Sequence, residues 1–379
     1  MRRLLGMVVS GLLVVVALVA GCGPGDGGGW QPPPATTAPD LAFDAFLEEG
    51  TLPAIAVAVV DGGDTQFRKV AGVRKRGDVT PVAETDAFHI GSNTKAMTSL
   101  LIGTAVDAGQ LTWNTTIAAV LTDTIAIGEA YRNVTVYQLL SHTSGLPDTL
   151  KPADWNSFFD STAPVATERR RMAELALARP PVSAAGTGYL YSNFNYVVAG
   201  LMLEVVTGQS WETLMSTRLF VPLGMLHSGF GPPAMPGLID APWGHSGGMP
   251  VDPASPYADN PLAMGPAGTV HASLDDILAY VPLYFDDGVG PTGRIVSSDV
   301  LAEMATPRLM SYGLGWVIQQ DSAGRTVLLH DGSNTMFLAL FLLVPARRAA
   351  IIVMTNAGDN NAMARVNQLA TYLVQHFEF

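Results

Sequence analysis

The sequence predicts an α+β fold in which strands from both ends of the chain share one antiparallel sheet. Segments with the spacing and composition of strands stand near the amino end (54–63 and 65–73) and again near the carboxyl end (between 313 and 356). The stretch from about 110 to 270 has instead the spacing of helices separated by loops. We therefore expect a sheet flanked by helices, with a mainly helical subdomain inserted between its terminal strands.

The chain has 379 residues, of which 48% are hydrophobic, and this is ample for a large buried core. Its formal charge is −12, and no basic stripe with interleaved aromatic residues is present. An acidic chain repels phosphate backbones, so nucleic acid is not an expected partner. The seven histidines are scattered without metal-ligand spacing, and the sequence predicts neither a metal site nor a cofactor.

The first 21 residues have the pattern of a secretory signal, because Arg2 and Arg3 precede an apolar run over 4–20. Cys22 is the only cysteine, so no intramolecular disulfide can form. The sequence "VAGC" before and at this position resembles the lipobox of bacterial lipoproteins, in which the signal is cut before a cysteine that then carries lipid. The resemblance implies an extracytoplasmic protein held at the membrane through Cys22. The alternative is an uncleaved anchor, although the apolar run is slightly short for a span.

Residues 22–40 are rich in Gly and Pro and predict a flexible tether, so we place the folded domain at 41–379. Its first helix is expected from Leu41 to Gly50. Strand 54–63 and its hairpin partner 65–73 follow. After Lys95, apolar residues recur every three or four positions and predict an amphipathic helix that ends near Gly109.

Capping residues mark several helices in the remainder of the chain. Thr135, Ser210 and Ser273 stand at expected helix starts, and Asp276 is placed to complete a capping box with Ser273. Helices are also expected over 166–178, with a solvated polar face, over 195–208 and over 362–377. Late strands are expected over 313–319, 326–330, 337–345 and 349–356.

The motif Ser92-Asn93-Thr94-Lys95 lies at the start of the helix after an extended segment. Residues three apart share a helix face, so the lysine amine can approach the serine hydroxyl. A serine becomes a nucleophile when a neighbouring base removes its proton, and burial near a helix amino terminus favours a neutral lysine. The alternative is a helix cap followed by a solvated lysine, which is common for this spacing.

Two further segments contain candidate functional groups. Tyr191 and Asn193 stand in "YLYSN", where a tyrosine can transfer protons and an asparagine can bind a substrate amide. His330, Gly332 and Ser333 follow the strand 326–330, where a small turn can offer a backbone N–H to an oxyanion. Taken alone, the first segment is better explained as a loop with an aromatic core residue and an Asn cap, and the second has the alternative of a strand-ending turn in which His330 is a core residue.

The sequence Gly244-His245-Ser246-Gly247-Gly248 fits the G-x-S-x-G pattern of a nucleophile elbow. That elbow requires a preceding strand and a following helix. Prolines at 242, 250 and 253 argue against both, so we expect a glycine-rich loop near the cleft.

Taken together, several motifs in order resemble the serine β-lactamase and penicillin-binding-protein superfamily, and within it the class C-like serine hydrolase branch. The resemblance covers about 40–379, and its motifs are "FHIGSNTK", "LLSHTSGLP", "YLYSN", "PLGM", "YGLGW", "HDG" and "IIVMTN". It implies a β-lactamase/transpeptidase-like fold.

The resemblance also implies a role for each site residue. Ser92 would be the nucleophile, Lys95 its base and Tyr191 the acid/base partner. Asn193 would bind the acyl side of the substrate. The N–H groups of Ser92 and Ser333 would bind the oxyanion, with Gly332 allowing the close approach. His142 would be structural.

This chain departs from the family pattern at His330 and Asp331, where many members have lysine and a hydroxyl residue. A fixed cation for a substrate carboxylate is thereby lost, because histidine is only partly charged near neutral pH. The resemblance implies a lipid-anchored hydrolase that acts through a Ser92 acyl-enzyme on an ester or amide, from the envelope (peptidoglycan) or a small molecule. A D-alanyl-D-alanine carboxypeptidase, a weak β-lactamase and a non-catalytic envelope binding protein remain alternatives.

Overall fold

The computed structural model describes residues 30–48 and 50–379. The predicted signal at 1–21 and the predicted lipidation site Cys22 lie outside these residues. No helix in the described part of the chain has the length and hydropathy needed to cross a membrane.

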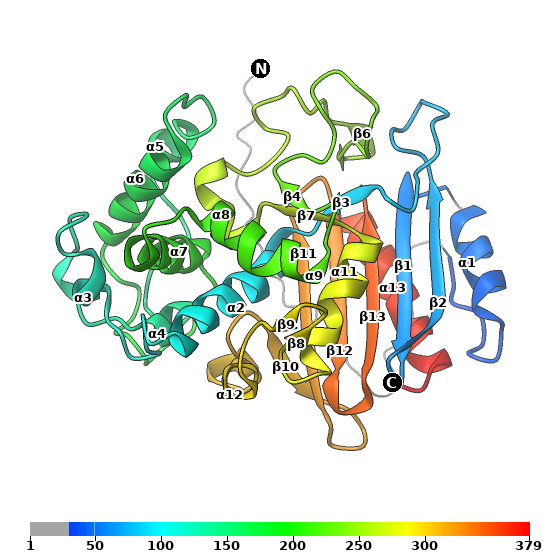
Figure 1. Ribbon diagram of the computed structural model, residues 1–379. Coiled ribbons are helices and arrows are strands. Elements are labelled where there is room, and N and C mark those ends of the chain that lie inside the picture. Colours follow the sequence, from blue (N-terminus) through cyan, green and yellow to red (C-terminus); the bar gives the residue numbers. More distant parts are fainter. Residues whose placement is uncertain (1–29, 49) are drawn as a thin grey trace.

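A six-stranded antiparallel sheet forms the centre of the molecule (Figure 1). Its strand order is β10-β11-β12-β13-β1-β2, so the first and last strands of the chain pair, with Ile55 opposite Thr355. This pairing confirms the predicted fold class. The strands are β1 (Ala54–Asp61), β2 (Asp64–Gly72), β10 (Val317–Gln320), β11 (Thr326–Ser333), β12 (Leu338–Val344) and β13 (Ala349–Thr355).

The sheet separates two hydrophobic cores, because alternate residues of each strand point to opposite faces. On one face, Val57 and Val353 pack with residues of α1 (Pro39–Glu48) and α13 (Asn360–His376). On the other face, Ala58 and Ile352 join the larger core that contains α2 (Thr94–Asp107) and the helical region.

The helical region extends to one side of the sheet in Figure 1. Its helices are α3 (Ile117–Leu121), α4 (Val136–Leu140), α5 (Pro152–Asn156), α6 (Val165–Leu177), α7 (Asn193–Thr207), α8 (Trp211–Met215) with a π-helical turn (Ser216–Phe220), α9 (Val221–Leu223) and α10 (Gly265–Gly268). Later in the chain, α11 (Leu274–Tyr280) and α12 (Ser298–Met304) pack beside the sheet. Short 3-10 helices are η1 (Gly91–Asn93), η2 (Glu129–Tyr131), η4 (Leu262–Met264), η5 (Val281–Tyr284), η6 (Leu309–Ser311) and η7 (Pro345–Arg347).

Three small sheets complete the described fold. The first has the order β3-β7-β4 and lies between the central sheet and the helical region. The strands are β3 (Ala87–His89), β4 (Gly229–Phe230), β7 (Val270–Ser273) and the hairpins β5 (His245–Ser246) with β6 (Met249–Pro250) and β8 (Val289–Gly290) with β9 (Gly293–Arg294).

The predicted caps are confirmed. Thr135 and Ser273 each accept a hydrogen bond from the backbone N–H three residues on, and both complete capping boxes. Ser210 caps α8 in the same way. These caps are local, which is why the sequence alone was enough to predict them.

Three elements differ from their predictions. The strand expected at 313–319 begins only at Val317. Strand β11 continues through Ser333 instead of turning after His330, because Gly332 and Ser333 pair with Ala339 and Leu338 of β12. The face of α6 expected to be solvated contains Arg169, which is fully buried between Glu204 and Glu212.

The segment before Leu41 packs on the domain. Trp30 is only 5% exposed, and its ring meets those of Phe46 and Tyr372 edge-on, with centroids 5.2 and 6.4 Å away. The Tyr372 hydroxyl donates a hydrogen bond of 2.6 Å to the carbonyl oxygen of Thr37. The packed structure thus starts before the predicted domain boundary at 41, and the tether stays a prediction for residues 22–29, which lie outside the described part.

Candidate active site

Ser92 lies in the short helix η1, where β3 turns into α2. Gly91 has a φ of +51°, and a Cβ on it would lie 2.3 Å from the backbone nitrogen of Ser333. Only glycine fits both conditions. The turn leaves Ser92 partly accessible, while Lys95, one turn later, is completely buried.

Lys95 makes three hydrogen bonds from its Nζ atom. The partners are Ser92 Oγ at 3.0 Å, Asn193 Oδ1 at 2.7 Å and the carbonyl oxygen of Ala267 at 2.7 Å. The last two are oxygens that only accept, so they use two N–H groups. An ammonium can donate to all three partners, and a neutral amine satisfies them equally with two N–H groups and a lone pair that accepts from the Ser92 hydroxyl.

Burial lowers the pKa of Lys95 well below its usual value, and the nearby Asp331 carboxyl only partly opposes this effect. Burial therefore favours the neutral amine, although the two oxygen acceptors by themselves would stabilise the ammonium form. The geometry brings a base within hydrogen-bond reach of the Ser92 hydroxyl, as the motif predicts.

Tyr191 borders the same cluster from the segment before α7. The Lys95 Nζ atom lies 4.8 Å from the centre of its ring. Burial raises the pKa of Tyr191 well above its usual value, and a hydrogen bond with Ser92 opposes that rise. The phenol therefore stays protonated near neutral pH.

His142 supports the segment that contains Tyr191. Its Nδ1 atom accepts hydrogen bonds from Ser192 N at 3.3 Å and from Asn195 Nδ2 at 3.0 Å. Its ring centre lies 4.3 Å from that of Tyr191, and the side chain is completely buried. These contacts fit the structural role expected for His142.

Asn193 contacts the lysine rather than standing free for a substrate. Its Oδ1 atom accepts from Lys95, while its Nδ2 atom donates to no acceptor among the described residues. Since Asn193 is partly accessible, this amide group can still face a ligand.

Strand β11 packs directly on the serine turn. A Cβ on Gly332 would lie 2.5 Å from the backbone nitrogen of Ser92 and 2.1 Å from the carbonyl oxygen of Ile90. Gly91 and Gly332 thus let the two backbones meet, and they bring the Ser92 and Ser333 N–H groups to one place. The sequence-predicted site residues between Ser92 and Ser333 lie in this one cluster, and Cys22 lies outside the described residues.

His330 is 4% exposed and both of its ring nitrogens have partners. Nδ1 is 2.6 Å from the carbonyl oxygen of Asp331, which can only accept, so Nδ1 donates. Nε2 is then the acceptor for the Tyr312 hydroxyl at 3.0 Å. Burial and the neighbouring Lys95 lower the pKa of His330 to about 3, so the ring is neutral at physiological pH.

A second buried group holds the serine turn, and sequence reasoning missed it. Gly91 N donates to His89 Nδ1 at 3.1 Å, and His89 Nε2 lies 3.0 Å from Asp259. Asp259 also accepts from Asn334 Nδ2 at 2.9 Å, one residue after Ser333. No spacing pattern joins residues 89, 259 and 334, so only the fold reveals this link between the two ends of the oxyanion cluster.

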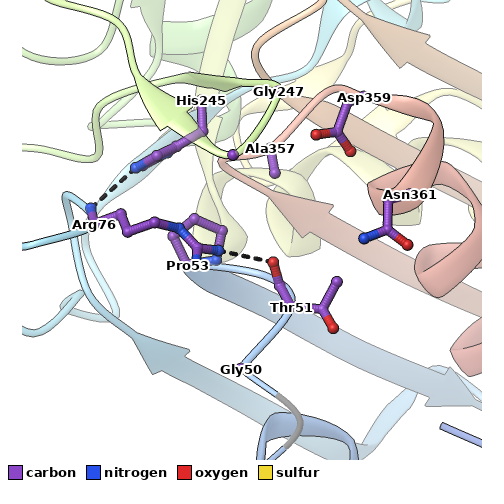
Figure 2. A pocket seen from close by; sticks show the side chains of 10 residues that line it. Gly50, Thr51, Pro53, Arg76, His245, Gly247, Ala357, Asp359 and Asn361 are labelled. Carbon is purple, nitrogen blue, oxygen red and sulfur yellow. Dashed lines mark hydrogen bonds between the residues drawn. The ribbon is translucent and has the colours of Figure 1, made fainter. Parts of the chain in front are cut away.

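The glycine-rich segment 244–248 forms a two-residue hairpin and is followed by no helix, as expected for a segment that is not a nucleophile elbow. His245 is buried and accepts from Arg76 N at 3.0 Å. It lines a cavity of about 480 Å³, shown in Figure 2, together with Arg76, Asp359 and Asn361. Ser92, Lys95 and Tyr191 are not part of this cavity.

Within residues 30–48 and 50–379, no group of three His, Cys, Asp or Glu residues could hold a metal ion.

The Beta-lactamase family model matches residues 40–375, and the chain belongs to this family of serine hydrolases. The chain is 31% identical to penicillin-binding protein 4 of Amycolatopsis lactamdurans over 83% of this chain and 84% of that protein.

Two solved structures share the fold. The octameric penicillin-binding protein homologue of Pyrococcus abyssi has a TM-score of 0.71 at 24% identity, over 89% of this chain and 76% of the other. A D-stereospecific amidohydrolase from Streptomyces sp. has a TM-score of 0.66 at 24% identity, over 86% and 96%. These likenesses and the family match confirm the β-lactamase/transpeptidase-like fold.

Proposed function

We propose that this chain hydrolyses an ester or amide through an acyl-enzyme on Ser92, and that it belongs to the class C-like branch of its family. The observation that supports this most directly is the set of three hydrogen bonds around Lys95. They suit a neutral amine that faces the serine hydroxyl.

In the first step, the Lys95 lone pair takes the Ser92 proton while Oγ bonds to the substrate carbonyl carbon. The carbonyl oxygen becomes an oxyanion, which the N–H groups of Ser92 and Ser333 bind. The tetrahedral intermediate then expels its leaving group. Tyr191, protonated because of its raised pKa, donates the proton to that group and regains one from the Lys95 ammonium. A water molecule then attacks the carbonyl carbon of the acyl-enzyme. The same groups move the protons in the opposite direction, and Ser92 is regenerated as the acyl product leaves.

Asn193 is proposed to orient the acyl side of the substrate. Its Oδ1 atom fixes Lys95, and its Nδ2 atom faces the ligand. Asn193 would therefore link the position of the substrate to that of Lys95. A substrate whose carbonyl group is bound out of place would then also lack an aligned proton acceptor.

A D-alanyl-D-alanine carboxypeptidase-like activity on peptidoglycan-derived peptides is the second candidate. The similarity to penicillin-binding protein 4 over most of both chains favours it. The D-stereospecific amidohydrolase that shares the fold is consistent with hydrolysis of amides more generally.

The test compares Ser92→Ala with the wild type on p-nitrophenyl esters, a D-Ala-D-Ala thioester and a penicillin. We expect Ser92→Ala to lose hydrolysis and to form no covalent adduct in intact-mass spectrometry, while its thermal unfolding is unchanged. Ser246→Ala is the matched control, because Ser246 is an exposed serine in the rejected G-x-S-x-G motif. Wild-type rates in Ser92→Ala would contradict the proposal, and the adduct that accumulates on the wild type ranks the substrate classes.

We also propose that Cys22 carries lipid and holds the domain at the outer face of a bacterial membrane. The support is the signal-like run and the lipobox-like "VAGC". Cells fed a palmitate analogue should label the wild type but not Cys22→Ala. Equal labelling of both proteins would refute the lipid site.

A further inference from the structure

We propose that the cleft contains a subsite for a positively charged group of the substrate, and that the carboxylate of Asp331 is its counter-ion. This inference rests on the proposed Ser92 chemistry and narrows its substrate class.

Asp331 occupies a position next to the reacting centre. It lies on β11 between His330 and Gly332. Beside the larger effect of burial, its charge acts to raise the pKa values of both Lys95 and Tyr191, so the carboxylate acts directly on the two groups beside Ser92. Strand β10 pairs with β11 only as far as Leu329, so it does not cover the edge of β11 beside Asp331. The side chain is half-buried, as are Ser92 and Tyr191.

The Asp331 carboxylate has no cationic partner among the described residues. None of the ion pairs in this part of the chain includes it, and its own backbone N–H is its one hydrogen-bond donor. Among the described residues, Lys95 is the basic group whose charge acts on Asp331, and burial lowers the pKa of Lys95 well below its usual value. Burial raises the pKa of Asp331 to about 6. A half-buried carboxylate with a single hydrogen-bond donor and no ion-pair partner is only partly compensated, and a substrate cation would supply the opposite charge.

His330 cannot act as a cation at this place. Both ring nitrogens are occupied, by the Asp331 carbonyl oxygen and the Tyr312 hydroxyl, and the ring is neutral. A substrate carboxylate near β11 would therefore meet Asp331 and find no opposite charge. The favoured substrates are esters or amides that bear an ammonium group, rather than peptides with a free carboxylate beside the scissile bond.

The test uses p-nitrophenyl esters whose acyl chains end in trimethylammonium, tert-butyl or carboxylate. The first two groups have nearly the same shape and differ in charge. A second series places the same three groups on the leaving side of a thioester. All rates are measured at about pH 8, above the Asp331 pKa of about 6.

In the wild type, we expect kcat/KM for trimethylammonium to exceed that for tert-butyl by about tenfold in at least one series. Asp331→Asn should reduce this ratio to near one and raise activity on the carboxylate ester relative to the tert-butyl ester, so that each rate is read against the tert-butyl rate of the same variant. Asp331→Lys should invert the preference. Asp123→Asn is the matched control, since it removes the same charge from an exposed position, and it should leave the ratio unchanged.

A ratio that is the same in Asp331→Asn and wild type in both series, with hydrolysis that still requires Ser92, would overturn the subsite alone. Hydrolysis that persists in Ser92→Ala would instead contradict the proposed function. Thermal unfolding of each variant separates loss of fold from loss of preference.

Discussion

Lys95 is completely buried, and this burial lowers its pKa and so favours the neutral amine. An arginine at this position keeps its charge, because a guanidinium is not deprotonated in proteins. It would therefore be unable to accept the Ser92 proton, however well it fitted.

Lys95→Arg should lower the rate of Ser92 acylation by about 10²- to 10⁴-fold, which is the rate enhancement that a positioned general base usually provides. The rate of adduct formation, followed by intact-mass spectrometry, measures this directly. Lys69→Arg is the control, because Lys69 is partly exposed and paired with Asp40 on the surface. Acylation at the wild-type rate in Lys95→Arg would exclude Lys95 as the base.

The neutral His330 makes stability depend on pH. Its pKa is about 3 in the folded protein against an ordinary 6.5, so the unfolded chain binds more protons between these values. Stability from this group is therefore present above pH 6.5 and is lost as pH falls toward about 3.

His330→Gln keeps one donor and one acceptor but does not titrate. We expect its free energy of unfolding to fall less steeply than that of the wild type between about pH 6.5 and 3, where each unit of pKa shift is worth about 1.4 kcal/mol. Urea unfolding at several pH values measures the slope. Parallel slopes for the two proteins would show that His330 is charged in the fold.

Among the elements, helices α6, α7 and α8 are joined by one buried ion cluster. Arg169 of α6 is fully buried and bonds to Glu204 of α7 and Glu212 beside it on α8. Its guanidinium also lies 5.8 Å from the ring centre of Trp211. Burial raises the pKa of Glu204, and Arg169 opposes that rise.

Arg169→Met should destabilise the fold by about 3 kcal/mol, because the largely buried Glu204 and the partly exposed Glu212 lose their counter-ion. Denaturant unfolding gives this value. Arg170→Met is the matched control, since Arg170 is the exposed neighbour on the same helix and should change stability by less than about 0.5 kcal/mol. Equal stability of the two variants would mean that the cluster does not hold the helices together.

The sequence was sufficient for features that depend on neighbouring residues. The caps at Thr135 and Ser273, the helix after Lys95 and the hairpin of β1 and β2 are all of this kind. The family motifs also located the site cluster. The extension of β11 to Ser333 depends on pairing with β12, and the burial of Arg169 depends on two later helices, so neither appears in a local pattern.

The same limit applies to the support of the serine turn. Asp259 comes from a long loop and meets His89 and Asn334, which stand far from it in the chain. Hydrogen bonds of this type follow from three-dimensional packing and leave no periodic signal. The neutral state of His330 was likewise hidden, because it arises from contact with Tyr312 and from burial.

At the scale of the whole molecule, the amino-terminal segment belongs to the packed structure. Trp30 fills a site between α1 and α13, although it stands in a Gly- and Pro-rich stretch. A large aromatic side chain that is 5% exposed contributes considerable apolar burial.

Trp30→Ala should lower the free energy of unfolding by about 3–5 kcal/mol, as expected for a large-to-small change in a core. It should leave Ser92 acylation in the folded protein unchanged, because the ring of Trp30 packs on Phe46 and Tyr372, which are not site residues. Trp155→Ala, at a half-buried tryptophan of α5, is the comparison and should cost less. An unaltered unfolding midpoint in Trp30→Ala would show that the segment contributes nothing to stability.

The pairing of β1 with β13 has a consequence for how the protein acquires its structure. Ala54 donates its N–H to the side chain of Asn356, across 302 positions of sequence. β1 therefore lacks its neighbour β13 until nearly the whole chain has been made, and only its hairpin with β2 can form early. Contacts of such long range slow folding and leave strand edges unprotected in the meantime. We therefore expect the nascent chain to depend on chaperones. The active site around Ser92 should assemble as one of the last events of folding.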